Sequence, residues 1–144
     1  MVYLDTSSLL KLLLWEPETI AVQDAVASED VVVLCALTEL EAEVQLRSAW
    51  LGGSMTRALY RRIADRLRTL PQQDPFVVRA LPGSVFQTAL RQVRQRERPH
   101  LRSLDRLHLA AMEELALRRL MTHDTLQAEA ARTLGYDVLS PGLR

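Results

Sequence analysis

Short apolar segments alternate with longer helical segments along the chain, and this alternation is the strongest constraint on its fold. The apolar segments read as β-strands, at residues 2–4, 31–34, 76–81, 119–122 and 138–139. The segments between them carry apolar residues at helical spacing, with Gly or Pro near several of their ends. We predict helices at residues 9–13, 17–27, 36–51, 54–70, 83–98, 104–118 and 124–134. Strands that alternate with helices are typical of an α/β layered fold with a mainly parallel sheet.

The length and composition favour a single domain over residues 1–144. A chain of this length can bury one hydrophobic core, and the predicted connections are too short for a domain boundary. Cys35 is the only cysteine, so no internal disulfide can form, and its apolar surroundings predict a buried thiol. No apolar run is long enough to cross a membrane, and Met1 leads into the first strand without a basic segment or a cleavage site. We therefore expect a cytoplasmic protein.

The formal net charge is zero, but acidic and basic residues are unevenly distributed along the chain. Residues 1–46 carry nine acids and one base, for a net charge of −8, whereas residues 47–106 carry thirteen Arg and four acids, for +9. Solvated helix faces explain many of these Arg side chains. The bias also fits an acidic centre beside an Arg-rich surface, because Arg binds phosphate in a bidentate manner.

Two aspartates stand where a predicted strand ends and a helix begins. Asp5 follows the strand at residues 2–4, and Asp124 follows the strand at residues 119–122. In parallel sheets, ligands bind in the crevice at the carboxyl ends of the strands. A helix N-cap explains either aspartate equally well when it is considered alone.

Glu41 falls within an apolar stripe of the helix predicted at residues 36–51. Leu37, Leu40, Val44 and Leu51 form this stripe, and we expect it to face the core. A carboxylate on the core-facing side of a helix needs a partner, because an unpaired buried charge is costly. The partner could be an Arg or a metal ion.

Asp105 lies in the first turn of a helix that is apolar on nearly every side, as expected of a buried central helix. The helix dipole favours a carboxylate at this position, so capping also explains Asp105. His108 follows one turn later. An Asp-x-x-His metal pair is one interpretation of this spacing, and a hydrogen-bonded core histidine is the other.

Taken together, the four acids favour a divalent-cation site. Carboxylates that converge repel one another, and a divalent cation relieves this repulsion. Carboxylate oxygens and retained waters are the ligands that Mg²⁺ prefers. One or two such ions can activate a water molecule and stabilise the leaving oxygen of a phosphodiester.

At this point the chain resembles the PIN-domain family and, within it, the VapC-type toxins of bacterial type II toxin–antitoxin pairs. The resemblance is carried by VYLDTSSL at residues 2–9, ALTELE at 36–41, SLDRLHLA at 103–110 and MTHD at 121–124, followed by VLSPG at 138–142. The matching segments occur in the family's order and extend from one end of the chain to the other. Arg106 departs from the pattern, since a small or apolar residue is common there. This Arg could contact phosphate or face solvent.

The resemblance implies a PIN-like three-layer α/β/α sandwich and an endoribonuclease that depends on Mg²⁺ or Mn²⁺. Asp5, Glu41, Asp105 and Asp124 would hold the metal, and the hydroxyl of Thr6 would support the site. It also implies an RNA substrate, a homodimer and a cognate antitoxin that blocks the active site. Given the acidic first 46 residues, we expect the antitoxin to place a basic side chain near that site.

Two other enzyme classes begin with a strand followed by Asp, and both fit the chain poorly. A phosphatase of the haloacid dehalogenase type needs a second Asp at position 7, which is Ser7, and a late lysine. A response-regulator receiver also needs a late lysine, but Lys11 is the only lysine. The alternative from another class is a catalytically idle PIN fold that acts only as a binding module.

Overall fold

The computed structural model describes residues 1–95 and 99–143. It contains the strands β1 (Val2–Leu4), β2 (Val32–Cys35), β3 (Phe76–Arg79), β4 (Arg119–Met121) and β5 (Asp137–Leu139). The helices are α1 (Thr6–Leu13), α2 (Thr19–Ala27), α3 (Ala36–Leu51), α4 (Arg57–Thr69), α5 (Val85–Gln95), α6 (Ser103–Glu114) and α7 (Thr125–Thr133), with a short 3₁₀ turn, η1 (Leu70–Gln72). Within the described ranges, no helix combines the length and the apolar character needed to cross a membrane.

The five strands form one parallel sheet in the order β3-β2-β1-β4-β5. β1 lies in the centre, and its Tyr3 is opposite Val33 of β2 on one side and Leu120 of β4 on the other. The central strands are buried along their whole length, which is the usual state of a parallel sheet covered by helices on both faces.

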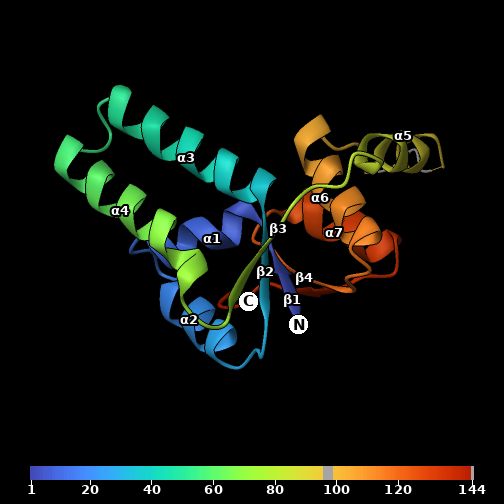
Figure 1. Cartoon of the computed structure of the whole chain (residues 1–144), viewed down its shortest axis with the longest axis horizontal. Coiled ribbons are helices and arrows are strands. Elements are labelled where there is room, and N and C mark those ends of the chain that lie inside the picture. The colour runs from blue at the N-terminus through green and yellow to red at the C-terminus, as the bar shows by residue number, and fades with distance from the viewer. Residues whose placement is uncertain (96–98, 144) are drawn as a thin grey trace.

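Alternating side chains of the central strands enter two separate cores. Val2, Leu4, Val32 and Leu34 pack with apolar residues of α1, α2, α3 and α4. Tyr3, Val33 and Cys35 point to the opposite face, where α6 and α7 cover the sheet. Figure 1 shows the two helical layers on either side of the sheet. The structure therefore confirms the predicted α/β/α sandwich with a parallel central sheet.

The strand order changes direction at β1 and β4, beside the carboxyl ends of these strands. The chain leaves β1 toward β2 on one side of the sheet and later returns to β4 on the other side. Such a reversal of strand order opens the sheet at its carboxyl edge, and ligands bind there in parallel sheets. Asp5 and Asp124 are the acids that follow these two strands.

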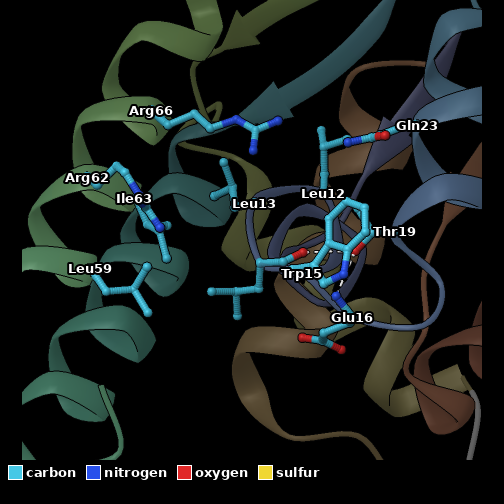
Figure 2. Close-up of a pocket in the computed structure, with 11 residues that line it drawn as sticks. Leu12, Leu13, Trp15, Glu16, Thr19, Gln23, Leu59, Arg62, Ile63 and Arg66 are labelled. Carbon is cyan, nitrogen blue, oxygen red and sulfur yellow. Dashed lines mark hydrogen bonds between the residues drawn. The ribbon is translucent and has the colours of Figure 1, made fainter. Parts of the chain in front are cut away.

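A separate apolar groove of about 890 Å³ lies between α1, α2 and α4. Its walls include Leu12 and Leu13 of α1 and Leu59 and Ile63 of α4 (Figure 2). Trp15 stands at its edge with 83% of its surface exposed.

Most predicted helices and strands are present. Several helix boundaries differ from the predicted ones because local capping sets where each helix begins or ends. The helix predicted at residues 54–70 begins at Arg57, because the Thr56 side chain caps it by accepting from the backbone N–H of Leu59. The helix predicted at residues 83–98 begins at Val85, and its predicted end lies outside the described residues. The helix predicted at residues 104–118 ends at Glu114.

The early end of α6 has a clear backbone cause. Ala116 adopts a left-handed conformation with φ of 55°. The backbone N–H of Leu117 then bonds to the carbonyl of Met112, and that of Ala116 bonds to Glu113. This Schellman motif usually places Gly at the left-handed position, as α7 does with Gly135.

We predict that Ala116→Gly stabilises the protein by up to about 1 kcal/mol, because a left-handed residue with a Cβ costs about 1–2 kcal/mol while glycine gains entropy on unfolding. Gly135→Ala is the reciprocal variant, since a Cβ there meets no atom within 4 Å and only backbone strain is added. It should lower stability by a similar amount. Urea unfolding of the three proteins measures both changes, and equal midpoints would contradict the interpretation.

Candidate active site

Asp5 is buried at the carboxyl end of β1, with 4% of its surface exposed, and it is also the N-cap of α1. Its Oδ1 accepts hydrogen bonds from the backbone N–H of Ser8 at 3.0 Å and from the Ser7 hydroxyl at 2.8 Å. Its Oδ2 accepts from the Thr122 hydroxyl. Burial raises the pKa of Asp5, and the hydrogen bonds from Thr122, Ser8 and Ser7 oppose this rise only in part.

Asp124 occupies the equivalent position after β4, where it caps α7. Its Oδ1 accepts from the backbone N–H of Gln127 at 2.9 Å, and its own N–H donates to the Thr122 hydroxyl at 3.1 Å. Thr122 therefore connects Asp124 with Asp5. Both strand-end aspartates are helix caps, as the simpler interpretation predicted, and they also lie together at the sheet's carboxyl edge.

The structure corrects the apolar stripe predicted for α3. Leu40, Val44 and Leu51 are 60%, 54% and 67% exposed, so the prediction that they face the core is wrong. The buried face of α3 carries Leu37, Thr38, Ala42 and Leu46. Ala42 and Leu46 pack with α1 and α4 in the core, and this packing sets the helix rotation. Glu41 borders the buried face, and only 14% of its side chain is exposed.

Two side chains contact the same oxygen of Glu41. The Thr6 hydroxyl donates to Oε1 at 2.9 Å, and Nε2 of His108 contacts Oε1 from α6. Burial would raise the pKa of Glu41, but the hydrogen bonds and the charge of His108 lower it below its usual value. An ionised carboxylate is therefore stable here.

The other ring nitrogen of His108 faces the central strands. Nδ1 lies 2.7 Å from the Tyr3 hydroxyl, which lies 2.9 Å from Sγ of Cys35. Burial would lower the pKa of His108, but its interactions with Cys35 and Glu41 raise it to about 9. Burial would raise the pKa of the Cys35 thiol, but hydrogen bonding to His108 and Tyr3 lowers it to about 7. The contacts place His108 with Glu41 rather than with Asp105, which favours the hydrogen-bonded core histidine.

Asp105 lies in the first turn of α6 and is paired with an exposed arginine. Nε of Arg102 is 2.8 Å from Oδ2 of Asp105, and the Arg102 side chain is 82% exposed. Asp105 raises the pKa of Arg102, with smaller contributions from Asp124 and Glu41. Asp105 and Glu41 both line a cavity of about 410 Å³ between α3 and α6.

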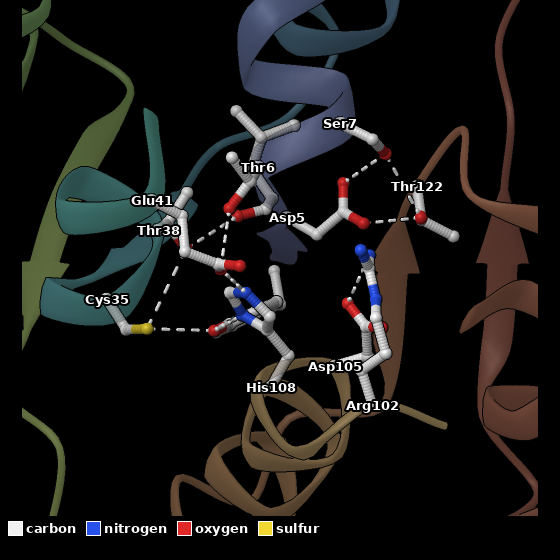
Figure 3. A network of polar contacts seen from close by, with 12 residues as sticks. Asp5, Thr6, Ser7, Cys35, Thr38, Glu41, Arg102, Asp105, His108 and Thr122 are labelled. Carbon is white, nitrogen blue, oxygen red and sulfur yellow. Dashed lines mark hydrogen bonds and ion pairs between the residues drawn. The ribbon is translucent and has the colours of Figure 1, made fainter. Parts of the chain in front are cut away.

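The predicted site residues thus come from four elements that meet at one edge of the sheet, and Figure 3 shows Asp5, Thr6, Glu41 and Asp105 among them. Asp5, Thr6 and Glu41 lie side by side, Asp124 is connected through Thr122, and Asp105 faces Glu41 across the cavity. Among residues 1–95 and 99–143, no three Asp, Glu, His or Cys side chains are close enough to ligate one ion together. The four acids therefore do not form a closed set of ligands around one point.

The surroundings of Arg106 differ from both interpretations given for it, contact with phosphate and exposure to solvent. It is only 5% exposed, and burial lowers its pKa. α6 lies between the sheet and α5, so most of its positions are enclosed (Figure 1). The expectations of phosphate contact and of solvent exposure were therefore both wrong.

Sequence reasoning missed Thr122, Ser7 and Tyr3, which hold the acids and the histidine. Thr122 had a usable signal, because it is a polar residue at a strand end two positions before Asp124. Tyr3 had none, since a tyrosine in an apolar strand reads as core. Its partner His108 lies 105 residues away in the sequence.

Comparisons with known proteins identify the family of the chain. The family model of the PIN domain matches residues 2–133. Ribonuclease VapC47 of Mycobacterium tuberculosis (strain CDC 1551 / Oshkosh) is 31% identical over 148 residues, covering 99% of this chain and 98% of that protein. Ribonuclease VapC46 of Mycobacterium tuberculosis (strain ATCC 25618 / H37Rv) is 32% identical over 142 residues, covering 97% of each.

The fold is also shared with a solved structure. The crystal structure of Mycobacterium tuberculosis VapC20, a Sarcin-Ricin loop cleaving toxin, superposes with a TM-score of 0.75. The match covers 98% of this chain and 100% of VapC20 at 15% sequence identity, so it shows the fold alone. The chain belongs to the PIN domain family and, within it, to the VapC-type ribonucleases.

Proposed function

We propose that the chain is an endoribonuclease, the toxin of a VapBC-type pair, and that residues 1–144 form one PIN domain. The observation that carries this proposal is the meeting of Asp5, Glu41, Asp105 and Asp124 at the carboxyl edge of the sheet. Two relatives of about this length are named ribonucleases, which supports RNA as the substrate class.

The site's own donor set fits a hard divalent cation. The four acids offer only oxygen ligands, as Mg²⁺ and Mn²⁺ prefer. The carboxylates of Asp5 and Asp124 accept hydrogen bonds from hydroxyl and backbone N–H groups and, in the part of the chain that the structure describes, form no ion pair. Asp5, Glu41, Asp105 and Asp124 would hold the ion partly through retained water molecules, because among the described residues no three of them are close enough to ligate it directly. The ion would supply an activated water and would stabilise the leaving oxygen of the phosphodiester.

The chain's own residues have distinct roles in this proposal. Thr6 and His108 orient Glu41, and Ser7 and Thr122 orient Asp5. Arg102 is exposed beside Asp105, where its guanidinium can meet a phosphate of the incoming RNA.

We predict cleavage of purified RNA by the wild type with Mg²⁺ or Mn²⁺, and its loss in excess EDTA. Asp5→Asn and Asp105→Asn should each reduce the rate by at least about 100-fold, as expected when a transition-state interaction of about 2.7 kcal/mol is removed. Because burial already disfavours the Asp5 charge, Asp5→Asn should keep the melting temperature in EDTA.

The matched control is Asp24→Asn, an exposed acid on α2 that should leave the rate unchanged. Cleavage that persists in EDTA, or in both active-site variants, would contradict the metal mechanism. No cleavage by the wild type in either metal would favour the catalytically idle binding module.

We assign the apolar groove between α1, α2 and α4 to the antitoxin. Leu12, Leu13, Leu59 and Ile63 offer apolar walls, while Arg62 and Arg66 stand at the rim (Figure 2). An amphipathic helix with acidic residues along its edges complements this surface. Leu12 lies about 10 Å from Asp5 along α1, at about 1.5 Å per residue. The same partner can therefore extend a basic side chain into the acidic site.

Trp15→Ala is expected to weaken antitoxin binding at least about tenfold, because exposed aromatic residues are frequent hot spots of interfaces. Calorimetry with the protein encoded by the upstream neighbouring gene measures this change, and RNA cleavage by the free toxin should stay unchanged. Arg132→Ala removes an exposed side chain in the last turn of α7, on the other side of the sheet, and should bind normally. Equal affinity of both variants would exclude the groove.

A homodimer is the third element of the proposal. α3 exposes Leu40, Val44 and Leu51, and α5 exposes Phe86, Leu90 and Val93. Exposed apolar stripes of this kind mark interaction surfaces. An apolar stripe of this kind can pair with its own copy, as a two-fold interface requires.

Sedimentation at micromolar concentration should therefore give twice the 16.3 kDa chain mass. Replacing Leu40 and Val44 together with Asp should produce monomers, because two buried charges on each chain would then face one another. Ile20→Asp, an equally exposed site on α2, should remain dimeric. A wild-type monomer would contradict this part of the proposal.

A further inference from the structure

A buried histidine contacts one of the candidate catalytic acids across the domain. His108 of α6 and Glu41 of α3 are 67 residues apart in the sequence, yet Nε2 of the ring meets Oε1 of the carboxylate. Only 3% of the His108 side chain and 14% of the Glu41 side chain are exposed. Water therefore competes little for this contact.

The direction of the hydrogen bond follows from the chemistry of the two groups. An ionised carboxylate only accepts, so the hydrogen must lie on Nε2. Nδ1 is 2.7 Å from the Tyr3 hydroxyl, which can donate to a neutral ring or accept from a charged one. Both protonation states of His108 thus keep the Nε2 hydrogen toward Glu41.

The two hydrogen bonds to Glu41 act on one oxygen only. Thr6 and His108 both donate to Oε1, and neither donates to Oε2. In Figure 3 the carboxylate lies between the Thr6 hydroxyl and the His108 ring. Rotation of the carboxylate would break both bonds, so its orientation is fixed.

The ring itself is also held in place. Tyr3 packs against it edge-on, with ring centroids 5.7 Å apart and an angle of 70° between the planes. Tyr3 lies on β1, two residues before Asp5, so the same strand that carries one candidate ligand orients the partner of another.

We propose that His108 is a positioning residue, whose Nε2 hydrogen fixes Glu41 so that Oε2 is presented to the divalent cation. The inference rests on the proposed function, since it assigns Glu41 to the metal. Side chains that orient metal ligands in this way typically change metal affinity about 10- to 100-fold when they are replaced.

Replacing His108 with Gln or with Asn offers a matched test of this role. The amide nitrogen of Gln reaches the position of Nε2, whereas that of Asn reaches only that of Nδ1. Both substitutions place a polar amide at the same buried position, so the comparison isolates the effect of the hydrogen bond donated to Glu41. In Mn²⁺ titrations followed by electron paramagnetic resonance, His108→Gln should bind within about threefold of wild type, and His108→Asn at least about tenfold more weakly.

Thermal melting in EDTA provides the folding control, and the melting temperatures of His108→Gln and His108→Asn should be close to each other. Equal Mn²⁺ affinity of wild type, His108→Gln and His108→Asn would overturn the positioning role. A wild type that binds no Mn²⁺ would instead overturn the proposed metal dependence, so the two failures are distinguishable.

A second measurement begins with the wild-type protein without metal. Nitrogen-15 NMR of the metal-free wild type should show the His108 proton on Nε2, with slow exchange because the ring is buried. A ring protonated only on Nδ1 would contradict the proposal. In Glu41→Gln the Nε2 proton signal should shift, since the charged acceptor is replaced by a neutral one.

Discussion

The pairing of β1 with β2 on one side and β4 on the other is the constraint on which the candidate site depends. Each of these strands ends at the same edge of the sheet, and a helix begins within four residues of each strand's end. Asp5 and Asp124 therefore lie close together although they are far apart in the sequence. A one-residue shift in register would move Tyr3 to the opposite face and separate it from His108.

The carboxylates of the candidate site have different partners in the fold. Glu41 faces the His108 ring, and Asp105 faces the Arg102 guanidinium. Asp5 receives hydrogen bonds from Ser7, Ser8 and Thr122 but no basic side chain in the described ranges, and burial raises its pKa. In the proposed metal site, Asp5 at the centre of the sheet is therefore an acid whose charge a cation would offset.

Much of this arrangement could be predicted from the sequence, because it depends on local patterns. The strands and helices follow from apolar spacing and caps, and the positions of Asp5 and Asp124 follow from strand ends. The contact between His108 and Glu41 could not be predicted, since it depends on how α3 and α6 rotate against the sheet. A helix of this kind has several plausible buried faces, and only packing selects one of them.

The rotation of α3 shows why the apolar pattern misled the prediction. Small and polar residues such as Ala42 and Thr38 are buried, while Leu40 and Val44 face outward beside Glu41. The exposed apolar side chains of such a helix contribute no free energy of burial to the stability of the isolated chain. Such a mismatch between pattern and burial is expected at functional surfaces. In the proposed function, α3 therefore has two roles: its outward apolar side binds a partner, and Glu41 is presented to the site.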